Sequence, residues 1–98
     1  MQIGDTLGYI TKDFKLETYE INKIKRTDEG FTIKARGFKD KLDYRTVKAN
    51  TDLLDSFDDD DSVLIEEPFV LTETNIVRIV NWCNWAQTHP ETAKTLFD

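Results

Sequence analysis

Cysteine, histidine, proline and glycine are scarce in this chain of 98 residues, which contains one, one, two and four of them respectively. The single cysteine, Cys83, cannot form an internal disulfide, so the fold does not depend on an oxidising compartment. Cys83 and the single histidine, His89, offer little for nucleophilic or acid–base catalysis, and the glycines form no phosphate-binding loop. We therefore expect a protein that is not an enzyme and that needs no cofactor.

Long apolar runs are absent as well. No run approaches the roughly 18 residues that a membrane-spanning helix requires. Charged residues near the start, such as Asp5, Lys12 and Asp13, interrupt the apolar core that a signal peptide would need. We therefore expect a cytoplasmic protein without a membrane partner.

Charge, by contrast, is abundant, and the two signs are separated along the sequence. Met1–Asn50 contains eleven basic and eight acidic residues, a net charge of +3. Thr51–Asp98 contains two basic and eleven acidic residues, a net charge of −9. A fold that keeps the two parts on separate faces would have a strong dipole and would steer a charged partner through its field.

The first part of the chain alternates polar and apolar residues, as β-strands do. We expect a tight turn at Thr27–Gly30 and a bulge near Ile24, where the alternation breaks. In the segment after the turn, alternation directs Phe31, Ile33 and Ala35 inward. The predicted strands are Thr6–Thr11, Leu16–Arg26, Phe31–Arg36 and Phe38–Val47.

Two helices are predicted towards the end of the chain. The longer runs from Glu73 to Thr88, with Thr72 as its N-cap. Pro90 cannot continue it and begins a shorter helix that reaches about Leu96. The apolar stripe of the longer helix should lie on the strands that contain Tyr19–Ile24, Phe31 and Ile33. This stripe consists of Ile76, Ile79, Val80, Cys83 and Ala86.

A chain of this length forms one domain, here with three parts. These are a basic, β-rich part (1–49), an acidic loop (50–62), and a part with a short strand at Val63–Ile65 followed by the helices (63–98). We expect an α+β fold in which a bent antiparallel sheet of four to five strands, small and barrel-like, is closed by one long helix and a short C-terminal helix.

The acidic residues between positions 52 and 67 are the first candidate binding surface. Four adjacent aspartates repel one another and must stay in solvent. They lack the glycine and the distal glutamate of a calcium loop, so we expect no metal. Either the segment is only a solvated loop, or it mimics the phosphates of nucleic acid and blocks a basic protein. The residues are Asp52, Asp55, Asp58, Asp59, Asp60, Asp61, Glu66 and Glu67.

The back of the long helix is the second candidate surface. Arg78, Trp82, Trp85 and His89 recur at intervals of four, three and four residues and therefore share a stripe. Arginine and tryptophan are favoured at interfaces, so Arg78 and Trp85 are predicted to contact a partner. In the alternative interpretation, Leu96–Phe97 folds back and covers the two indoles.

The basic part of the chain is the third candidate surface. Its aromatic residues interleave with lysine and arginine, as in small barrels that bind nucleic acid by stacking bases. Acidic residues offset this charge, so a continuous phosphate track is not expected. These acidic residues are Glu17, Glu20, Asp28, Asp40 and Asp43.

Two motifs, Ile3–Thr6 (IGDT) and Pro68–Glu73 (PFVLTE), resemble a loose group of small, mostly uncharacterised proteins of Gram-positive phages and mobile elements. In that group the first motif leads into a curled sheet and the second opens a closing helix. The chain differs from the group in its Asp-rich insertion, in Asn75 and in the Trp-bearing extension. The resemblance implies inhibition of host defence enzymes, as by anti-CRISPR proteins, and it identifies no site residues.

We therefore expect a noncatalytic, phage-type inhibitor that acts in the host cytoplasm. It would block a larger, basic, nucleic-acid-handling defence enzyme through protein–protein contact, with acidic mimicry of nucleic acid as one route. The alternative function is that of a small β-barrel that binds nucleic acid through its basic sheet. The sequence does not decide whether the protein forms homo-oligomers.

Overall fold

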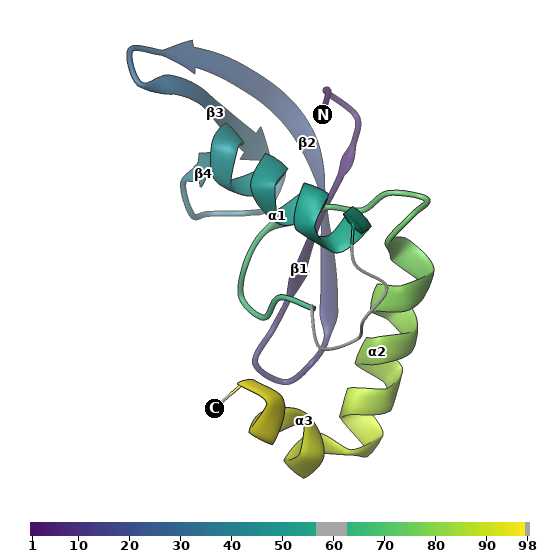
Figure 1. The fold of residues 1–98 in the computed structure, drawn as a ribbon. Helices are drawn as coiled ribbons and strands as arrows, with labels where there is room; N and C mark the ends of the chain where they lie inside the picture. Colours follow the sequence, from purple (N-terminus) through teal and green to yellow (C-terminus); the bar gives the residue numbers. More distant parts are fainter. Residues whose placement is uncertain (57–62, 98) are drawn as a thin grey trace.

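The computed structural model describes residues 1–56 and 63–97 and confirms the predicted α+β fold (Figure 1). Within these residues an antiparallel sheet of five strands, in the order β4-β3-β2-β1-β5, packs with three helices. In chain order the elements are β1 (Thr6–Ile10), β2 (Leu16–Thr27), β3 (Gly30–Ala35), β4 (Leu42–Asp43), α1 (Tyr44–Ser56), β5 (Phe69–Val70), α2 (Ile76–Thr88) and α3 (Pro90–Phe97).

The hairpin of β2 and β3 follows the predicted turn and bulge. Thr27 pairs with Gly30 across a two-residue turn. The register shifts between Ile21 and Lys23, close to the predicted break in alternation at Ile24. The extra residue places Ile21 and Ile24, three positions apart, on the same face of the sheet.

The sheet separates two apolar clusters. Leu7 pairs with Val70 and Gly8 with Phe69, and successive strand residues point to opposite faces, so the clusters lie on opposite sides of β1 and β5. The first cluster consists of Ile10, Phe14, Leu54, Val63, Phe69, Ile79, Trp82, Cys83, Ala86 and Ala93. The second consists of Leu7, Ile21, Ile33, Ala35, Leu42, Val47 and Val70.

The predicted fourth strand over Phe38–Val47 is confirmed only as β4, because residues 44–56 form α1. The predicted loop over residues 50–62 is wrong for residues 50–56. Asp43 caps the helix, because its Oδ2 accepts a hydrogen bond from Thr46 N (3.3 Å). Val47 and Leu54 lie two turns apart and are buried in the second and the first cluster respectively. Packing in both clusters overrides the weak strand pattern. α1 contacts β3, β4 and β5, and its Thr51 accepts a hydrogen bond from Val70 N of β5.

The start of α2 differs from the prediction, whereas its end at Thr88 agrees. The helix begins at Ile76 instead of Glu73, and the three residues before it form a turn. The Thr72 hydroxyl accepts a hydrogen bond from Asn75 N (3.2 Å), and Asn75 Oδ1 accepts one from Thr72 N (3.0 Å). This reciprocal pair has the pattern of a capping box with Thr72 in the predicted N-cap role, and Ile76 N donates to Thr72 O (3.0 Å).

The buried face of α2 is also rotated from the predicted one. Trp82 is 2% exposed, whereas Ile76 and Val80 are 40% and 39% exposed. Burial of an indole removes more apolar area from water than burial of either aliphatic side chain. The helix packs on the first cluster, so the predicted contact with Ile33, which belongs to the second, is wrong.

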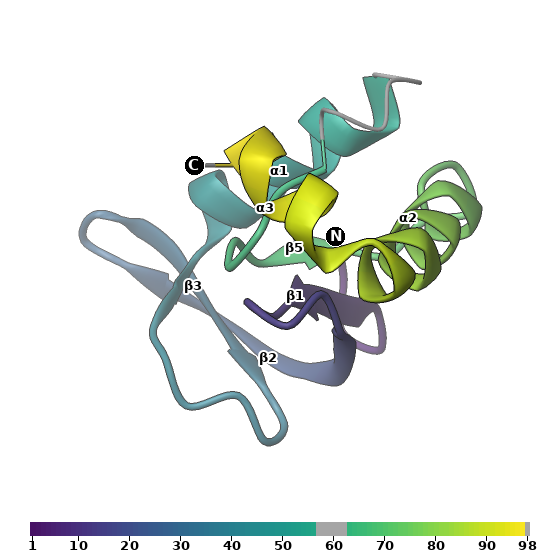
Figure 2. The same ribbon diagram turned by 90° about the horizontal axis from the view of Figure 1, so that it is seen from below.

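The segment before α2 was partly mispredicted, and the one after it was predicted correctly. Val63–Ile65 forms no strand, and Phe69–Val70 pairs with β1 instead. The short C-terminal helix is confirmed as α3, where Ala93 N donates to His89 O (3.0 Å). Figure 2 shows α3 beside the end of α2, on the side of the molecule away from the β2–β3 hairpin.

Candidate nucleic-acid interface

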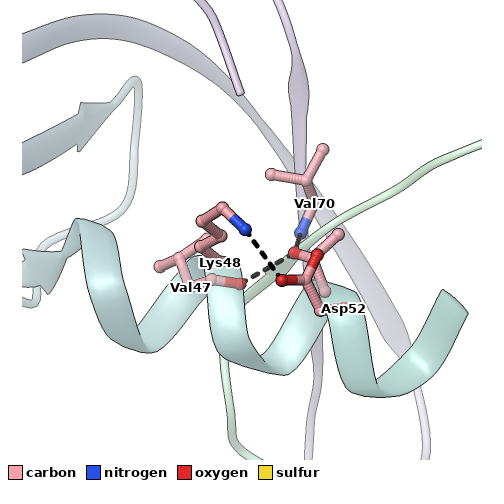
Figure 3. A network of polar contacts seen from close by, with 5 residues as sticks. Val47, Lys48, Asp52 and Val70 are labelled. Carbon is pink, nitrogen blue, oxygen red and sulfur yellow. Dashed lines mark hydrogen bonds and ion pairs between the residues drawn. The ribbon is translucent and has the colours of Figure 1, made fainter. Parts of the chain in front are cut away.

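The predicted acidic surface is not a single unit in the part of the chain that the structure describes. Asp58, Asp59, Asp60 and Asp61 lie outside the described residues. Asp52 is exposed on α1 and pairs with Lys48 one turn earlier, with 2.8 Å between Nζ and Oδ2 (Figure 3). The hydrogen bond to Asp52 raises the pKa of Lys48. Solvent screens an exposed pair of this kind, so it contributes little to stability.

Asp55 is bound inside the fold. Its Oδ1 accepts hydrogen bonds from Thr72 Oγ1 (2.7 Å) and from Asn75 Nδ2 (2.8 Å). Asn75 is completely buried, and its Nδ2 also donates to Val70 O (3.1 Å). Asp55 therefore connects the end of α1 to the turn before α2, and these bonds occupy one of its two carboxylate oxygens.

Glu66 and Glu67 are exposed in the segment before β5. Glu66 N donates to Ile10 O (2.8 Å), and the residue has a φ of 60°, in the left-handed region that non-glycine residues seldom adopt. Its carboxylate lies 3.9 Å from Lys12 Nζ. The segment thus extends the contact with β1 and presents two carboxylates far along the chain from Asp52.

Arg78 and Trp85, the predicted partner contacts on α2, both contact other residues of the chain. Arg78 Nη2 donates to the carbonyl oxygen of Leu54 in the last turn of α1, where a cation complements the helix dipole. Trp85 is 37% exposed and stacks on His89, with 5.3 Å between ring centroids. Arg78 is thereby tied to α1, and part of the Trp85 indole remains accessible.

Leu96, one of the two residues predicted to cover the indoles, is 45% exposed. The side chain of Phe97 lies outside the described part of the structure. Phe14 instead contacts Trp82 edge-on, with 5.6 Å between ring centroids. The indole of Trp82 is thus covered by the turn between β1 and β2.

One face of the β2–β3 hairpin carries a cluster of positive charge. Lys23 lies directly opposite Lys34, and Lys25 follows Lys23 by two residues, so the three side chains share this face. Arg36 follows Lys34 by two residues and extends the cluster. All four side chains are exposed, and none forms an ion pair with another described residue. We call Lys23, Lys25, Lys34 and Arg36 the basic face.

The basic face is exposed to solvent. The first cluster and α2 lie on the same side of the sheet, but they cover only the end formed by β1 and β5. Ile10 and Phe69 of the first cluster lie on this side at β1 and β5. Figures 1 and 2 show the β2–β3 hairpin extending away from α2 and α3. No helix therefore shields these cations from solvent in the described part of the chain.

The acidic residues that were expected to offset the basic half lie mostly elsewhere. Glu17 accepts a hydrogen bond from a neighbouring tyrosine, and Asp28 is in the turn at the hairpin tip. Asp43 caps α1 but lies opposite Thr32, on the same face of the sheet as Lys25 and Lys34. Glu20 and Asp40 remain at the border of the basic face. Acidic residues therefore border this face, as expected, but none of them lies between Lys23 and Lys34.

A groove of about 750 Å³ adjoins the basic face, between the hairpin and the loop that follows β3. Phe38 lines it and is half-buried, with edge contacts to the rings of Tyr9 (5.5 Å) and Tyr19 (5.1 Å). One carboxylate, Asp40, lines the groove as well. The basic residues of the lining are Lys25, Lys34, Arg36, Lys39 and Lys41.

Other chemistry finds little support in residues 1–56 and 63–97. No group of three or more His, Cys, Asp and Glu side chains in these ranges could hold a metal ion. Burial raises the pKa of Cys83 to about 11, so the thiol stays protonated at neutral pH. None of the described helices combines the length and the apolar character that a membrane crossing requires.

No protein-family model matches the chain, and no curated protein and no solved structure is significantly similar to it.

Proposed function

We propose that the protein binds single-stranded nucleic acid, without catalysis, through the basic face and the adjoining groove. Six exposed cations gather there against three bordering carboxylates, Glu20, Asp40 and Asp43. The acidic surface behind our first expectation is less well supported, because Asp55 is bound within the fold and Asp52 and Glu66 each have a lysine neighbour. The alternative expectation, nucleic-acid binding through the sheet, thus becomes the favoured one.

The observation that carries the proposal is the direct opposition of Lys23 and Lys34. Like charges at facing positions of an antiparallel pair destabilise a sheet by a few tenths of a kcal/mol to about 1 kcal/mol. A phosphate between the two ammonium groups would replace this repulsion by two attractions. Lys25 and Arg36 lie on either side along the strands and would contact neighbouring phosphates of the same backbone.

The groove favours a single strand over a duplex. Phe38 lines the groove and is only half-buried, and Tyr9 and Tyr19 hold its ring on the side of the sheet that carries the second cluster. Unpaired bases stack on such rings without regard to sequence, whereas the bases of a duplex are already stacked on each other. We therefore expect little base specificity and a preference for single strands.

Titration of labelled oligonucleotides at several salt concentrations tests the proposal. Replacement of Lys23, Lys34 and Arg36 by glutamine should weaken binding strongly at low salt. It should also lower the slope of log K against log salt by about two, because each phosphate contact on a single strand contributes about 0.7 to that slope. Phe38→Leu should weaken binding to single strands at every salt concentration.

The matched control is a group of three other cations, all lysines, at the far end of the molecule. Lys12, Lys15 and Lys94 line a groove between the β1–β2 turn and α3. Their replacement by glutamine changes the net charge by the same amount and should leave the slope unchanged. Equal losses from the two triple variants would show that binding follows total charge alone, and the proposal would be wrong.

The expected inhibitor of a nucleic-acid-handling defence enzyme remains the second candidate function, with its anti-CRISPR role resting on the sequence resemblance alone. A separate groove of about 440 Å³ favours it, because four carboxylates line this groove near the N-terminus, α1 and the start of α2. They belong to Asp5, Asp52, Asp55 and Glu73. Arranged together, such charges could occupy the basic channel of a partner protein.

The two candidates give opposite results in one experiment. An inhibitor that mimics nucleic acid should bind heparin-type polyanions poorly and should compete with oligonucleotides for a basic nuclease. Asp52→Asn and Glu73→Gln together should then slow association with that nuclease, because exposed charges act mainly on encounter. Oligonucleotide binding by the protein alone favours the first candidate.

A further inference from the structure

One edge of β2 is open, and this openness has a structural cause. β2 has twelve residues, but β1 pairs only with its first five, from Leu16 to Glu20. Beyond this ladder, Gly4 N donates to Ile21 O (2.9 Å) and Ile21 N donates to Asp5 O (2.9 Å). The chain then turns away, so Asn22–Thr27 has β3 on one side and no strand on the other within the described residues.

The turn at the N-terminus keeps this edge open. Asp5 N donates to Gln2 O (3.1 Å), and Gln2 N donates to Asp5 Oδ2 (2.7 Å). Gly4, inside this turn, has a φ of 97°, a conformation that glycine adopts without strain. The first residues therefore curl back and do not extend β1 along the rest of β2.

The backbone groups that face the open edge can be assigned. Thr27 and Gly30 close the two-residue turn as a hydrogen-bonded pair, and such pairs alternate with non-bonded ones along an antiparallel ladder. Thr32 Oγ1 reaches Lys25 O (3.5 Å), which agrees with Lys25 facing β3. Ile24 and Arg26 consequently direct their N–H and C=O groups towards the open edge, where no described residue bonds to them.

The side chains beside the edge differ between its two faces. Lys23 and Lys25 lie on the basic face. On the opposite face Ile24 is partly buried and packs on the second cluster, as does Met1. Arg26 follows Ile24 by two residues on this face and is exposed. A strand placed along this edge would therefore have Lys23 and Lys25 beside one set of alternate side chains, and Ile24 and Arg26 beside the other.

We propose that this edge of β2 binds an extended acidic peptide as an additional strand, with acidic residues beside Lys23 and Lys25 and aliphatic residues beside Ile24. Backbone bonds to Ile24 and Arg26 would supply affinity, and the alternation of side chains would supply specificity. This binding mode uses the backbone edge and does not rest on the proposed nucleic-acid function.

The same charges argue against a second copy of the chain as the occupant. Pairing of two β2 edges would bring Lys23 and Lys25 of one copy beside those of the other, with no described acid between them. Lysines on exposed edges commonly prevent association of this kind. The positive charge of Lys23 and Lys25 repels a second copy of the chain and attracts an acidic strand, so an acidic strand is the partner that fits this edge.

Amide hydrogen exchange tests the proposal directly. The probe is an acetylated heptapeptide of alternating glutamate and valine, and the control is a peptide of the same composition with its glutamates and valines in separate blocks. The amides of Ile24 and Arg26 should exchange rapidly in the free protein, while that of Lys25 is protected by β3. The alternating peptide should protect Ile24 and Arg26, and the block peptide should not.

N-methylation of the peptide tests the strand geometry without any change to the protein. Methyl groups on one set of alternate amides should weaken binding at least about tenfold, because they remove bonds to the edge. Methyl groups on the other set should leave binding unchanged, because those amides face solvent. Equal effects of the two sets, or no protection of Ile24 and Arg26, would overturn the proposal.

A pair of variants at one position separates backbone from charge. Arg26→Pro and Arg26→Gln remove the same charge, but only proline removes the N–H at the edge, a change that edge strands tolerate. Peptide affinity should fall further for Arg26→Pro than for Arg26→Gln, while oligonucleotide affinity should be equal for the two. Replacement of Lys34 and Arg36 by glutamine should weaken oligonucleotide binding and leave peptide affinity unchanged. Failure of one proposal can therefore be recognised separately from failure of the other.

Discussion

The sheet has one edge at β5 and another along the outer half of β2. The two edges differ in whether their backbone N–H and C=O groups have hydrogen-bond partners. At β5, Val70 N donates to Thr51 Oγ1 (2.8 Å), and Figure 3 shows Val70 directed towards α1. Asn50 Nδ2 donates to Pro68 O (2.9 Å), so side chains of α1 close the edge. At β2, Ile24 and Arg26 have no such partner in the described chain. One edge is closed by a helix, and the other is protected only by charge.

The comparison indicates a division between stability and binding. The closed region contains the end of α1, the buried Asn75 and the fully buried Phe69. The open hairpin has exposed lysines and a phenylalanine, Phe31, that is 46% exposed although alternation predicted it to point inward. Substitutions in the closed region should therefore change the free energy of unfolding, and those in the hairpin should change affinity.

The largest effect is expected for Ile79→Ala in the closed region. Ile79 is completely buried in the first cluster, and emptying such a site costs about 2–5 kcal/mol of unfolding free energy. Ile76→Ala on the same helix is the control, because Ile76 is 40% exposed and surface changes stay within about 0.5 kcal/mol. Urea denaturation measures both, and similar losses for the two variants would show that the face of α2 is misassigned.

An intermediate effect is expected for Thr51→Val, which opens the closed edge. The Thr51 hydroxyl donates to Val47 O (2.8 Å) and accepts from Val70 N, so valine leaves a part-buried amide without its acceptor. The loss should be about 1–3 kcal/mol in the same denaturation experiment. Thr51→Ser keeps the hydroxyl and should lose clearly less. If serine and valine destabilise equally, the hydrogen bond is not what closes this edge.

Much of the fold could be predicted from the sequence because local signals agree with the tertiary structure there. Alternation identified the hairpin of β2 and β3, and turn chemistry placed Thr27–Gly30 correctly. Pro90 marked the boundary between α2 and α3. These signals depend on a few neighbouring residues, so they can be recognised without knowledge of the tertiary contacts.

The errors arose where distant residues decide the outcome. α1 carries a capping aspartate, Asp43, and apolar residues at Val47 and Leu54, but both clusters are needed to favour helix over strand there. The phase of α2 depends on Phe14, which comes from a turn far away in the sequence and covers Trp82. Periodicity alone could not distinguish the indole face from the aliphatic one.

The candidate site was only partly visible in the sequence. The spacings Lys-x-Lys at Lys23 and Lys25 and Lys-x-Arg at Lys34 and Arg36 place each pair on one face of a strand, and this signal was available. The cross-strand register, which brings the two pairs together, depends on the bulge before Lys23. A shift of one residue would place one pair on the opposite face.

The smallest change in stability is expected for Lys34→Glu, and its sign is opposite to that of the other two. The new carboxylate would lie directly opposite Lys23, so repulsion becomes attraction and the protein should gain about 0.2–1 kcal/mol. Lys34→Thr, which is neutral and favours strands, should gain less. The gain should shrink in high salt, because both side chains are exposed.

The same two variants should weaken oligonucleotide binding, Lys34→Glu more than Lys34→Thr. A variant that is more stable and binds less would indicate that the lysine pair serves binding at the expense of the fold, whereas unchanged binding would leave the basic face as an ordinary solvated surface.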